Sequence, residues 1–202
     1  MNATDTLLEN LRHEVEFYGR SGIETIYKSD VVFSITLNNF SDLPESCNFD
    51  QAVSDFMWFK DCAEQHKFLD HPNPAKSWWV QHHGNDRPPG ANWDFAGLQR
   101  QLRDTNGRRC VLINPCGQDN PPPALFYQFQ MEDGGLHASV FMRSSDLINC
   151  LPQQVAIDYM LLRHVAAISG SDTGRLTYHL GNLYIHYEDV VDLEVTDFDV
   201  GF

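Results

Sequence analysis

Residues 133–167 read DGGLHASVFMRSSDLINCLPQQVAIDYMLLRHVAA and carry the strongest structural signal in the chain. Apolar and polar residues alternate over 136–145, which predicts a half-buried strand. Residues 153–169 are apolar at most positions and long enough for a buried helix, and Gly170 supplies a stop signal. A strand followed directly by a long buried helix is therefore the unit from which we predict the fold.

Weaker signals surround this unit. The sequence EDGG at 132–135 separates two alternating runs, which predicts a hairpin with a strand at 125–131. Further helices are expected at 5–18, 50–60 and 94–104, and further strands at 31–37, 108–114, 176–187 and 192–200. The Pro-, His- and Trp-rich stretch at 70–94 is expected to be a long loop that lines a site. The sum predicts an α+β fold, a mostly antiparallel sheet packed by a long buried helix, in one domain over residues 1–202.

Composition limits the classes of ligand. The chain has 14 Lys and Arg against 28 Asp and Glu, a net charge of −14, which disfavours binding to nucleic acid. A small anion stays possible where cations converge, and ten of the 14 cations are arginine, which suits phosphate. No apolar run approaches the length of a membrane span. The five cysteines form no CxxC pair, so we expect a cytoplasmic protein with reduced thiols.

Several motifs occur in an order that resembles the thymidylate synthases and deoxycytidylate hydroxymethylases. The motifs are Arg20-Ser21-Gly22, DFMWFKD at 55–61, PPGANW at 88–93, Gly107-Arg108-Arg109, Arg143-Ser144 with Asp146, Leu151-Pro152 before the long helix, and Leu183-Tyr184. The resemblance extends over about residues 20–196. It implies a thymidylate-synthase-like fold and a homodimer formed through the sheet.

The resemblance also implies a site for a pyrimidine nucleoside monophosphate. Its phosphate ligands would be Arg20, Arg108, Arg109, Arg143 and Ser144, with Arg108 and Arg109 crossing the dimer interface. Its base and sugar ligands would be Asp146, Gln154, Asn182 and Tyr184. Methylenetetrahydrofolate is the cofactor that the resemblance implies, and no metal is expected. The family's hydroxymethylases often serve viral DNA modification, so a virus-infected bacterial host is one implied setting.

The chain departs from the family at the catalytic centre. Counting back from Gln128-Phe129, Pro123 occupies the position of the family's nucleophilic cysteine, and Ala124 that of the following histidine. A proline cannot attack C6 of a pyrimidine. The family's catalytic glutamate is replaced by Asp55.

Three hypotheses follow from these departures. In the first, the chain transfers a methyl or hydroxymethyl group to C5 of a dUMP- or dCMP-type substrate, using a relocated thiol of Cys150 or Cys116; a buried, inert thiol is the alternative for each. In the second, a different nucleotide chemistry runs without attack at C6. Its acid–base candidates are Asp55, His82, His83 and Asp158. In the third, the chain is a non-catalytic homologue that binds a nucleotide or a partner.

Overall fold

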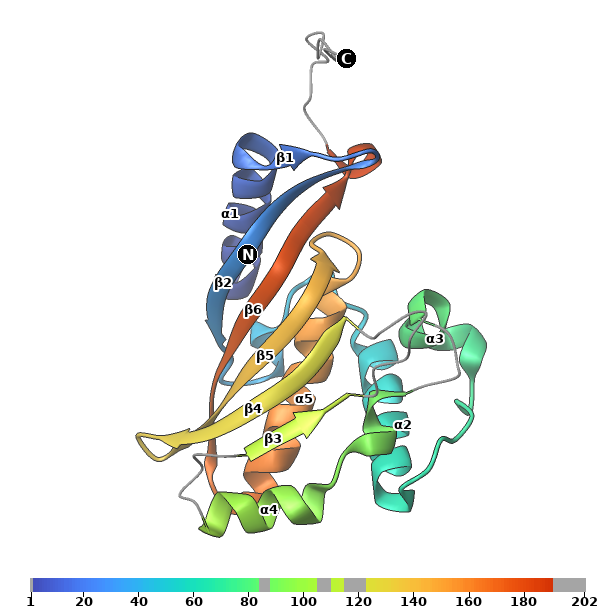
Figure 1. The fold of residues 1–202 in the computed structure, drawn as a ribbon, viewed down its shortest axis with the longest axis vertical. Helices are drawn as coiled ribbons and strands as arrows, with labels where there is room; N and C mark the ends of the chain where they lie inside the picture. The colour runs from blue at the N-terminus through green and yellow to red at the C-terminus, as the bar shows by residue number, and fades with distance from the viewer. Residues whose placement is uncertain (1, 84–87, 105–109, 115–122, 191–202) are drawn as a thin grey trace, which may run out of the picture.

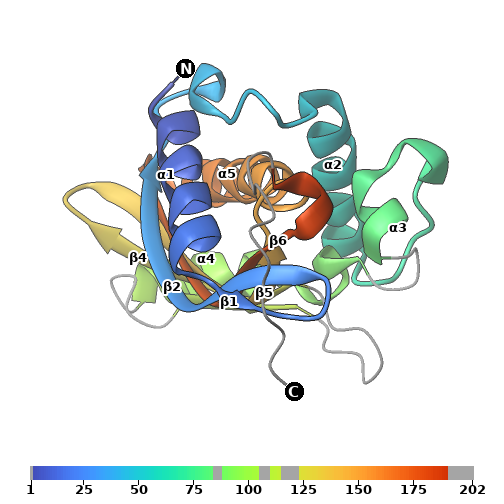
Figure 2. The same cartoon turned by 90° about the horizontal axis from the view of Figure 1, so that it is seen from above.

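The computed structural model describes residues 2–83, 88–104, 110–114 and 123–190. This part of the chain forms two layers, a six-stranded sheet and helices that lie on one side of it (Figures 1 and 2). Buried apolar side chains from both layers form one continuous core. The architecture is the predicted α+β class.

The strands follow a spatial order that differs from their order in the chain. Across the sheet they are β1 (Arg20–Ser21), β2 (Thr25–Thr36), β6 (Asp172–His186), β5 (Gly135–Asp146), β4 (Ala124–Glu132) and β3 (Cys110–Ile113). Neighbouring strands are antiparallel except β5 and β6, which are parallel. A parallel pair needs a crossover connection, and the long helix α5 provides it.

The hairpin and the buried helix predicted from the opening stretch are both present. Asp133 and Gly134 turn between β4 and β5 with φ of 51° and 82°, the left-handed pair that a tight hairpin requires. Helix α5 (Leu151–Ser169) is buried along most of its length and ends at Gly170 with φ of 70°. It begins two residues earlier than predicted, because Pro152 fits the first turn of a helix.

The remaining helices cover the same side of the sheet as α5. They are α1 (Ala3–Tyr18), α2 (Phe49–Gln65), α3 (Trp78–His83), α4 (Phe95–Asp104) and the 3-10 turns Phe40–Asp42, Pro74–Lys76, Pro89–Asn92 and Tyr187–Asp189. Figure 2 shows α1 and α2 on either side of α5, and α3 outside α2. Asn2 caps the start of α1 through a reciprocal capping box with Asp5.

In β2, β6 and β5, the alternation of buried and exposed residues shifts by one residue at the same level of the sheet. At this level, the register of cross-strand partners omits Asp30 on β2, Gly181 on β6 and Arg143 on β5. Asp30 has φ of 55°, and a Cβ on Gly181 would lie 2.7 Å from the carbonyl oxygen of Arg143. The buried positions of β6 are 176, 178 and 180 before this level and 183 and 185 after it. The kink therefore turns positions 182 and 184 away from the core.

Two sequence expectations need correction. The segment at 70–94 is not a long loop, since its described residues include α3 and two 3-10 turns. Helix α3 forms because Ser77 and a carboxylate from α2 cap its first turn. Strand β2 starts at Thr25 rather than at residue 31. The strand expected at 192–200 lies outside the described residues. Among the residues that the structure describes, no helix is long and apolar enough to span a membrane.

Candidate functional site

Two rows of cross-strand partners gather predicted site residues from distant parts of the chain. The first row runs from Arg20 on β1 through Tyr27 on β2 and Tyr184 on β6 to Asp146 on β5. The second runs from Ser29 through Asn182 to Ser144. Directly opposed residues in a sheet lie on one face, with their Cβ atoms about 5 Å apart. The register therefore brings five of the predicted residues together: Arg20, Ser144, Asp146, Asn182 and Tyr184.

A pocket of about 260 Å³ opens where the two rows meet. It is lined by Thr25, Tyr27, Ser144, Asn182 and Tyr184. Its lining atoms include hydroxyl groups from all three strands, and Ser29 Oγ donates to Asn182 Oδ1 at 3.0 Å. Hydroxyls and amides can both donate and accept, so this lining suits a polar ligand.

Two arginines of the predicted site lie near pocket residues: Arg20 pairs with Tyr27 across the strands, and Arg143 precedes Ser144 and affects the pKa of Tyr184. Among the described residues, neither Arg20 nor Arg143 forms an ion pair, and both side chains are exposed. Some other cations in the same part of the chain are paired with acids, as in Arg175 with Glu132 at 2.9 Å. Two unpaired guanidiniums in a chain with 28 acidic residues leave positive charge available for an anion.

Tyr184 is one of the half-buried residues of the pocket. Burial raises the pKa of its phenol, the nearby Asp146 and Cys150 add to this effect, and Arg143 opposes it. The hydroxyl therefore stays protonated at neutral pH and can donate a hydrogen bond. The same electrostatic contacts place Arg143, Asp146 and Cys150 close to Tyr184.

Asp146 is buried and shapes the loop that follows β5. Its Oδ1 accepts from the backbone N–H groups of Ile148 and Asn149 at 2.9 and 3.1 Å. Its Oδ2 accepts from Asn149 Nδ2 at 3.1 Å and lies 3.7 Å from His186 Nε2. The carboxylate is thus engaged within the loop that leads into α5.

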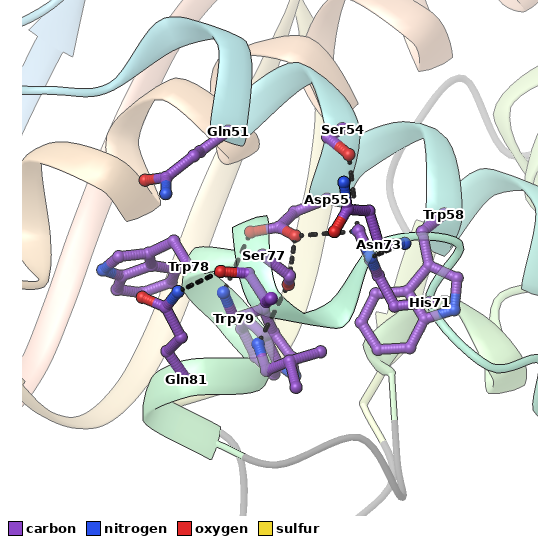
Figure 3. Close-up of polar contacts among 12 residues, drawn as sticks. Gln51, Ser54, Asp55, Trp58, His71, Asn73, Ser77, Trp78, Trp79 and Gln81 are labelled. Atoms are coloured by element: carbon purple, nitrogen blue, oxygen red, sulfur yellow. Dashed lines mark hydrogen bonds and ion pairs between the residues drawn. The ribbon is translucent and has the colours of Figure 1, made fainter.

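Asp55 is fully buried and joins α2 to α3 (Figure 3). Its Oδ1 accepts from Ser77 Oγ at 2.5 Å, and its Oδ2 accepts from the Trp79 backbone N–H at 2.9 Å. His71 Nε2 lies 3.3 Å from Oδ1. Because His71 Nδ1 accepts from the Asn73 backbone N–H, the proton of a neutral ring sits on Nε2 and faces Asp55. Burial raises the pKa of Asp55, and these donors oppose the rise.

His82 and His83 lie on helix α3 rather than in the long loop that the sequence suggested. His82 stacks on Trp78 and its Nδ1 lies 2.8 Å from the Trp78 carbonyl oxygen. Burial lowers the pKa of His83 to about 4, and nearby His82 and Arg143 contribute. His83 is therefore neutral at pH 7. No group of three or more potential metal ligands occurs within the described residues.

A buried polar cluster lies under the long helix. Asp158 is 1% exposed, and its Oδ1 accepts from Tyr127 Oη at 2.9 Å and from Gln154 Nε2 at 2.8 Å. Its Oδ2 accepts from Tyr178 Oη at 3.0 Å. Burial raises the pKa of Asp158 to about 7, although these three donors oppose the rise. Gln154 Oε1 is buried and has no hydrogen-bond partner in the described structure.

Comparison with known proteins adds one finding to this geometry. The chain is 36% identical over 78 residues to a thymidylate synthase of Symbiobacterium thermophilum. Part of the chain is similar to thymidylate synthase. The match covers 38% of this chain and 28% of the relative, so the chain aligns with less than a third of that protein's length. No family model matches the chain.

One of the departures noted in the sequence, Pro123, lies beside Arg143. The Arg143 backbone N–H donates to the Pro123 carbonyl oxygen at 2.9 Å, so the position of the missing nucleophile adjoins the arginine. Cys150 occupies the residue position just before α5, near Tyr184, and its side chain makes no capping hydrogen bond. Burial and the charge of Asp146 raise the pKa of its thiol to about 12. This shift is opposite to the lowering that the relocated-thiol hypothesis requires.

Some predicted site residues lie outside the described residues, and some pocket residues escaped prediction. Arg108, Arg109 and Cys116 belong to the first group. Thr25 and Tyr27 belong to the second. Their alternation with Ser29 is a period-two signal that could have extended the predicted strand towards the N-terminus.

Proposed function

We propose that the chain binds a pyrimidine deoxynucleoside 5′-monophosphate in the pocket between β2, β6 and β5. The observation that carries this proposal is the cross-strand register, which gathers Arg20, Ser144, Asn182 and Tyr184 around one polar pocket. These are residues to which the resemblance gives phosphate or sugar contacts. The partial likeness to a thymidylate synthase supports the same ligand class.

The phosphate is proposed to lie at the arginine end of the pocket. Arg20 and Arg143 offer planar donors, and Ser144 adds a hydroxyl. Hydrogen bonds from guanidinium to phosphate are short and strong, because both partners are charged. Arg108 and Arg109 of a second copy are proposed to complete the phosphate site.

The sugar and base are proposed to lie towards Tyr184 and α5. Tyr184 keeps its proton and can donate to the sugar hydroxyl, and Asn182 lies next to it in the pocket lining. The carboxylate of Asp146 is engaged in hydrogen bonds within its own loop. Contacts from this loop to the base are therefore proposed to come from its backbone groups. Gln154 is proposed to read the edge of the base.

A binding experiment with Arg143→Ala tests this site. We expect dUMP or dCMP to raise the Tm of the wild-type chain, since a ligand that binds only the folded state stabilises it. Arg143→Ala should weaken binding by roughly 1.5–3 kcal/mol, the scale of a hydrogen bond to a charged group. Calorimetric titration measures the affinity.

Arg175→Ala is the matched control, because Arg175 lies at the other end of β6 in an exposed ion pair. Its affinity should equal that of the wild type. Absence of any Tm shift with pyrimidine nucleoside monophosphates would refute the proposed function. An unchanged affinity in Arg143→Ala would refute the placement of the phosphate.

The reaction that the resemblance implies is C5 methyl or hydroxymethyl transfer with methylenetetrahydrofolate. The described residues do not fit that chemistry: Pro123 has no nucleophile, the Cys150 thiol holds its proton, and Asp55 is buried among its own donors. We therefore derive no step through the folate. The geometry favours nucleotide binding without attack by Cys150, which is common to the second and third hypotheses.

Release of tritium from C5 of labelled dUMP or dCMP, with folate present, tests the relocated thiol. We expect Cys150→Ala and the wild type to release tritium at the same rate, because a thiol with a pKa near 12 supplies little thiolate at neutral pH. The same expectation holds if neither protein releases tritium. Cys47→Ala, a half-buried thiol elsewhere, controls for loss of a cysteine as such. Wild-type release that disappears only in Cys150→Ala would identify Cys150 as the nucleophile.

The homodimer is proposed to form through the side of the sheet that the helices leave open. One row of partners on this side, which we name the open-face row, crosses five strands. Its members are Val32, His179, Phe141, Phe126 and Ile113. Phe126 stacks on Phe141 and Phe141 on His179, with ring centroids 4.3 and 4.4 Å apart. An apolar row of this length is typical of an interface, and a second copy there would border the nucleotide pocket.

A further inference from the structure

The buried cluster around Asp158 lies on one stripe of α5, and the first residue of that stripe is near Tyr184 of the proposed nucleotide pocket. Cys150, Gln154 and Asp158 follow one another at intervals of four residues, and residues at this spacing share a face of a helix. The first member is close enough to Tyr184 to affect its pKa. The stripe therefore leads from Cys150, near the pocket residue Tyr184, to the core at Asp158, with Gln154 between them.

The amide of Gln154 is held in one orientation. Its Nε2 donates to Asp158 Oδ1, and an ionised carboxylate can only accept, so an amide turned by 180° would bring two acceptors together. Asp158 is itself held by Tyr127 from β4 and Tyr178 from β6. The amide oxygen, Gln154 Oε1, is therefore left without a hydrogen-bond partner in the described structure, and this atom is an acceptor.

We propose that Asp158 is a positioning residue that orients Gln154 so that the site requires a hydrogen-bond donor on the edge of the base. This inference rests on the proposed nucleotide site. An unpaired buried acceptor is costly, and a ligand donor relieves that cost, whereas a ligand acceptor adds repulsion. The ring N3–H of uracil and the 4-amino group of cytosine are donors of this kind. A pyrimidine whose edge carries only acceptors is excluded.

The experiment compares dUMP with the 5′-monophosphate of 2-pyrimidinone deoxyriboside, which lacks both the N3 hydrogen and the 4-amino group. We expect the wild type to bind dUMP at least about tenfold more tightly, the scale on which a site built for one hydrogen bond discriminates. In Asp158→Asn the preference should fall towards unity. An asparagine at 158 can donate as well as accept, so the Gln154 amide is free to turn and offer its N–H group to the ring nitrogen.

Two controls separate this role from a structural one. Affinity for deoxyribose 5-phosphate should be the same in the wild type and in Asp158→Asn, because that probe has no base. Tyr178→Phe removes one donor to Asp158 and leaves the contact with Gln154. Loss of this donor raises the pKa of Asp158 further, so the comparison is made at alkaline pH, where Asp158 is ionised and the variant should keep the preference for dUMP. A preference in Asp158→Asn equal to that of the wild type would overturn the inference.

A second measurement uses the wild type alone and serves if Asp158→Asn does not fold. The groups that face Asp158 are Tyr127, Tyr178 and Gln154, and the pKa of each tyrosine is raised well above its ordinary value. Asp158 is thus the member of the cluster that titrates near neutral pH. We expect the preference for dUMP to decline as pH falls through about 7, since a protonated Asp158 can donate to the amide oxygen. Both ligands carry the same phosphate, so its ionisation cancels in the ratio.

A preference that stays constant across this pH range would overturn the inference. The outcomes also remain distinct from failure of the proposed function. If neither nucleotide binds the wild type, the nucleotide site itself is wrong. If both bind equally well, the site stands and the role of Asp158 is refuted.

Discussion

At the scale of single residues, Asp158 is a buried carboxylate that faces three neutral donors and, within the described part of the chain, no cation. Burial disfavours its charged form, and the hydrogen bonds from Tyr127, Tyr178 and Gln154 offset only part of that cost. The folded chain therefore binds a proton at Asp158 more tightly than the unfolded chain does. This group stabilises the fold at low pH, and that contribution is lost as pH rises from about 3.8 to about 7.

The stability of Asp158→Asn should show this dependence. The substitution keeps the shape of the side chain and removes its charge, so the variant has no such loss. We expect the Tm of Asp158→Asn minus that of the wild type to increase between about pH 5 and about pH 8, because the wild type becomes less stable over this window. Thermal unfolding at several pH values measures the difference. A difference that is constant, or that decreases with pH, would contradict the raised pKa.

At the scale of elements, helix α3 has six residues and depends on contacts outside itself. So short a helix is marginal without tertiary support. Ser77 accepts from the Val80 backbone N–H at 3.0 Å, and Asp55 accepts from that of Trp79, so two oxygens from different elements cap its first turn. This anchoring places His83 near Arg143. It also uses the carboxylate of Asp55, the residue to which the resemblance gives a catalytic role, for hydrogen bonds to Ser77 and Trp79.

Ser77→Ala should expose this dependence. The change removes a helix cap and leaves a buried oxygen of Asp55 with one donor fewer, so we expect a loss of about 1–3 kcal/mol in the free energy of unfolding. Denaturant unfolding measures it. Gln81→Ala removes only an exposed hydrogen bond, to the Ala75 carbonyl oxygen, and should cost less than about 0.5 kcal/mol. Equal losses in the two variants would mean that the cap does not anchor α3.

At the scale of the whole molecule, the described helices leave one side of the sheet open. Val32 is 60% exposed and Ile113 61% exposed, and both belong to the open-face row. Because the kink turns positions 182 and 184 away from the core, the nucleotide pocket opens near this row. Dimerisation and nucleotide binding are therefore expected to be coupled.

Phe141→Asp tests that coupling. A charge in the middle of an apolar interface is costly to bury, so we expect the variant to be monomeric and to bind dUMP or dCMP less tightly. Light scattering after size-exclusion chromatography gives the mass. Ile23→Asp, at a residue 99% exposed in the turn after β1, should leave both mass and affinity unchanged. A Phe141→Asp dimer would show that the copies do not meet on the open face.

Local sequence patterns predicted much of the fold. The Asp133-Gly134 hairpin and the helix that ends at Gly170 depend on residues adjacent in the chain, so their signals could be read directly. The start of β2 at Thr25 and the helix at 78–83 were missed. The first follows from pairing with β6, and the second from a cap supplied by α2, and neither partner is close in sequence.

The sequence by itself determined the α+β class, the strand and buried helix at 133–167, and the acidic composition against which a few arginines stand out. It also identified Pro123 at the position where a nucleophile was expected. The tertiary structure decided which of those residues meet. The alignment of Arg20 with Tyr184 and Asp146, the raised pKa of Cys150 and the single orientation of Gln154 all arise from strand register and burial. Register and burial depend on residues far apart in the chain, and that is why local pattern could not supply them.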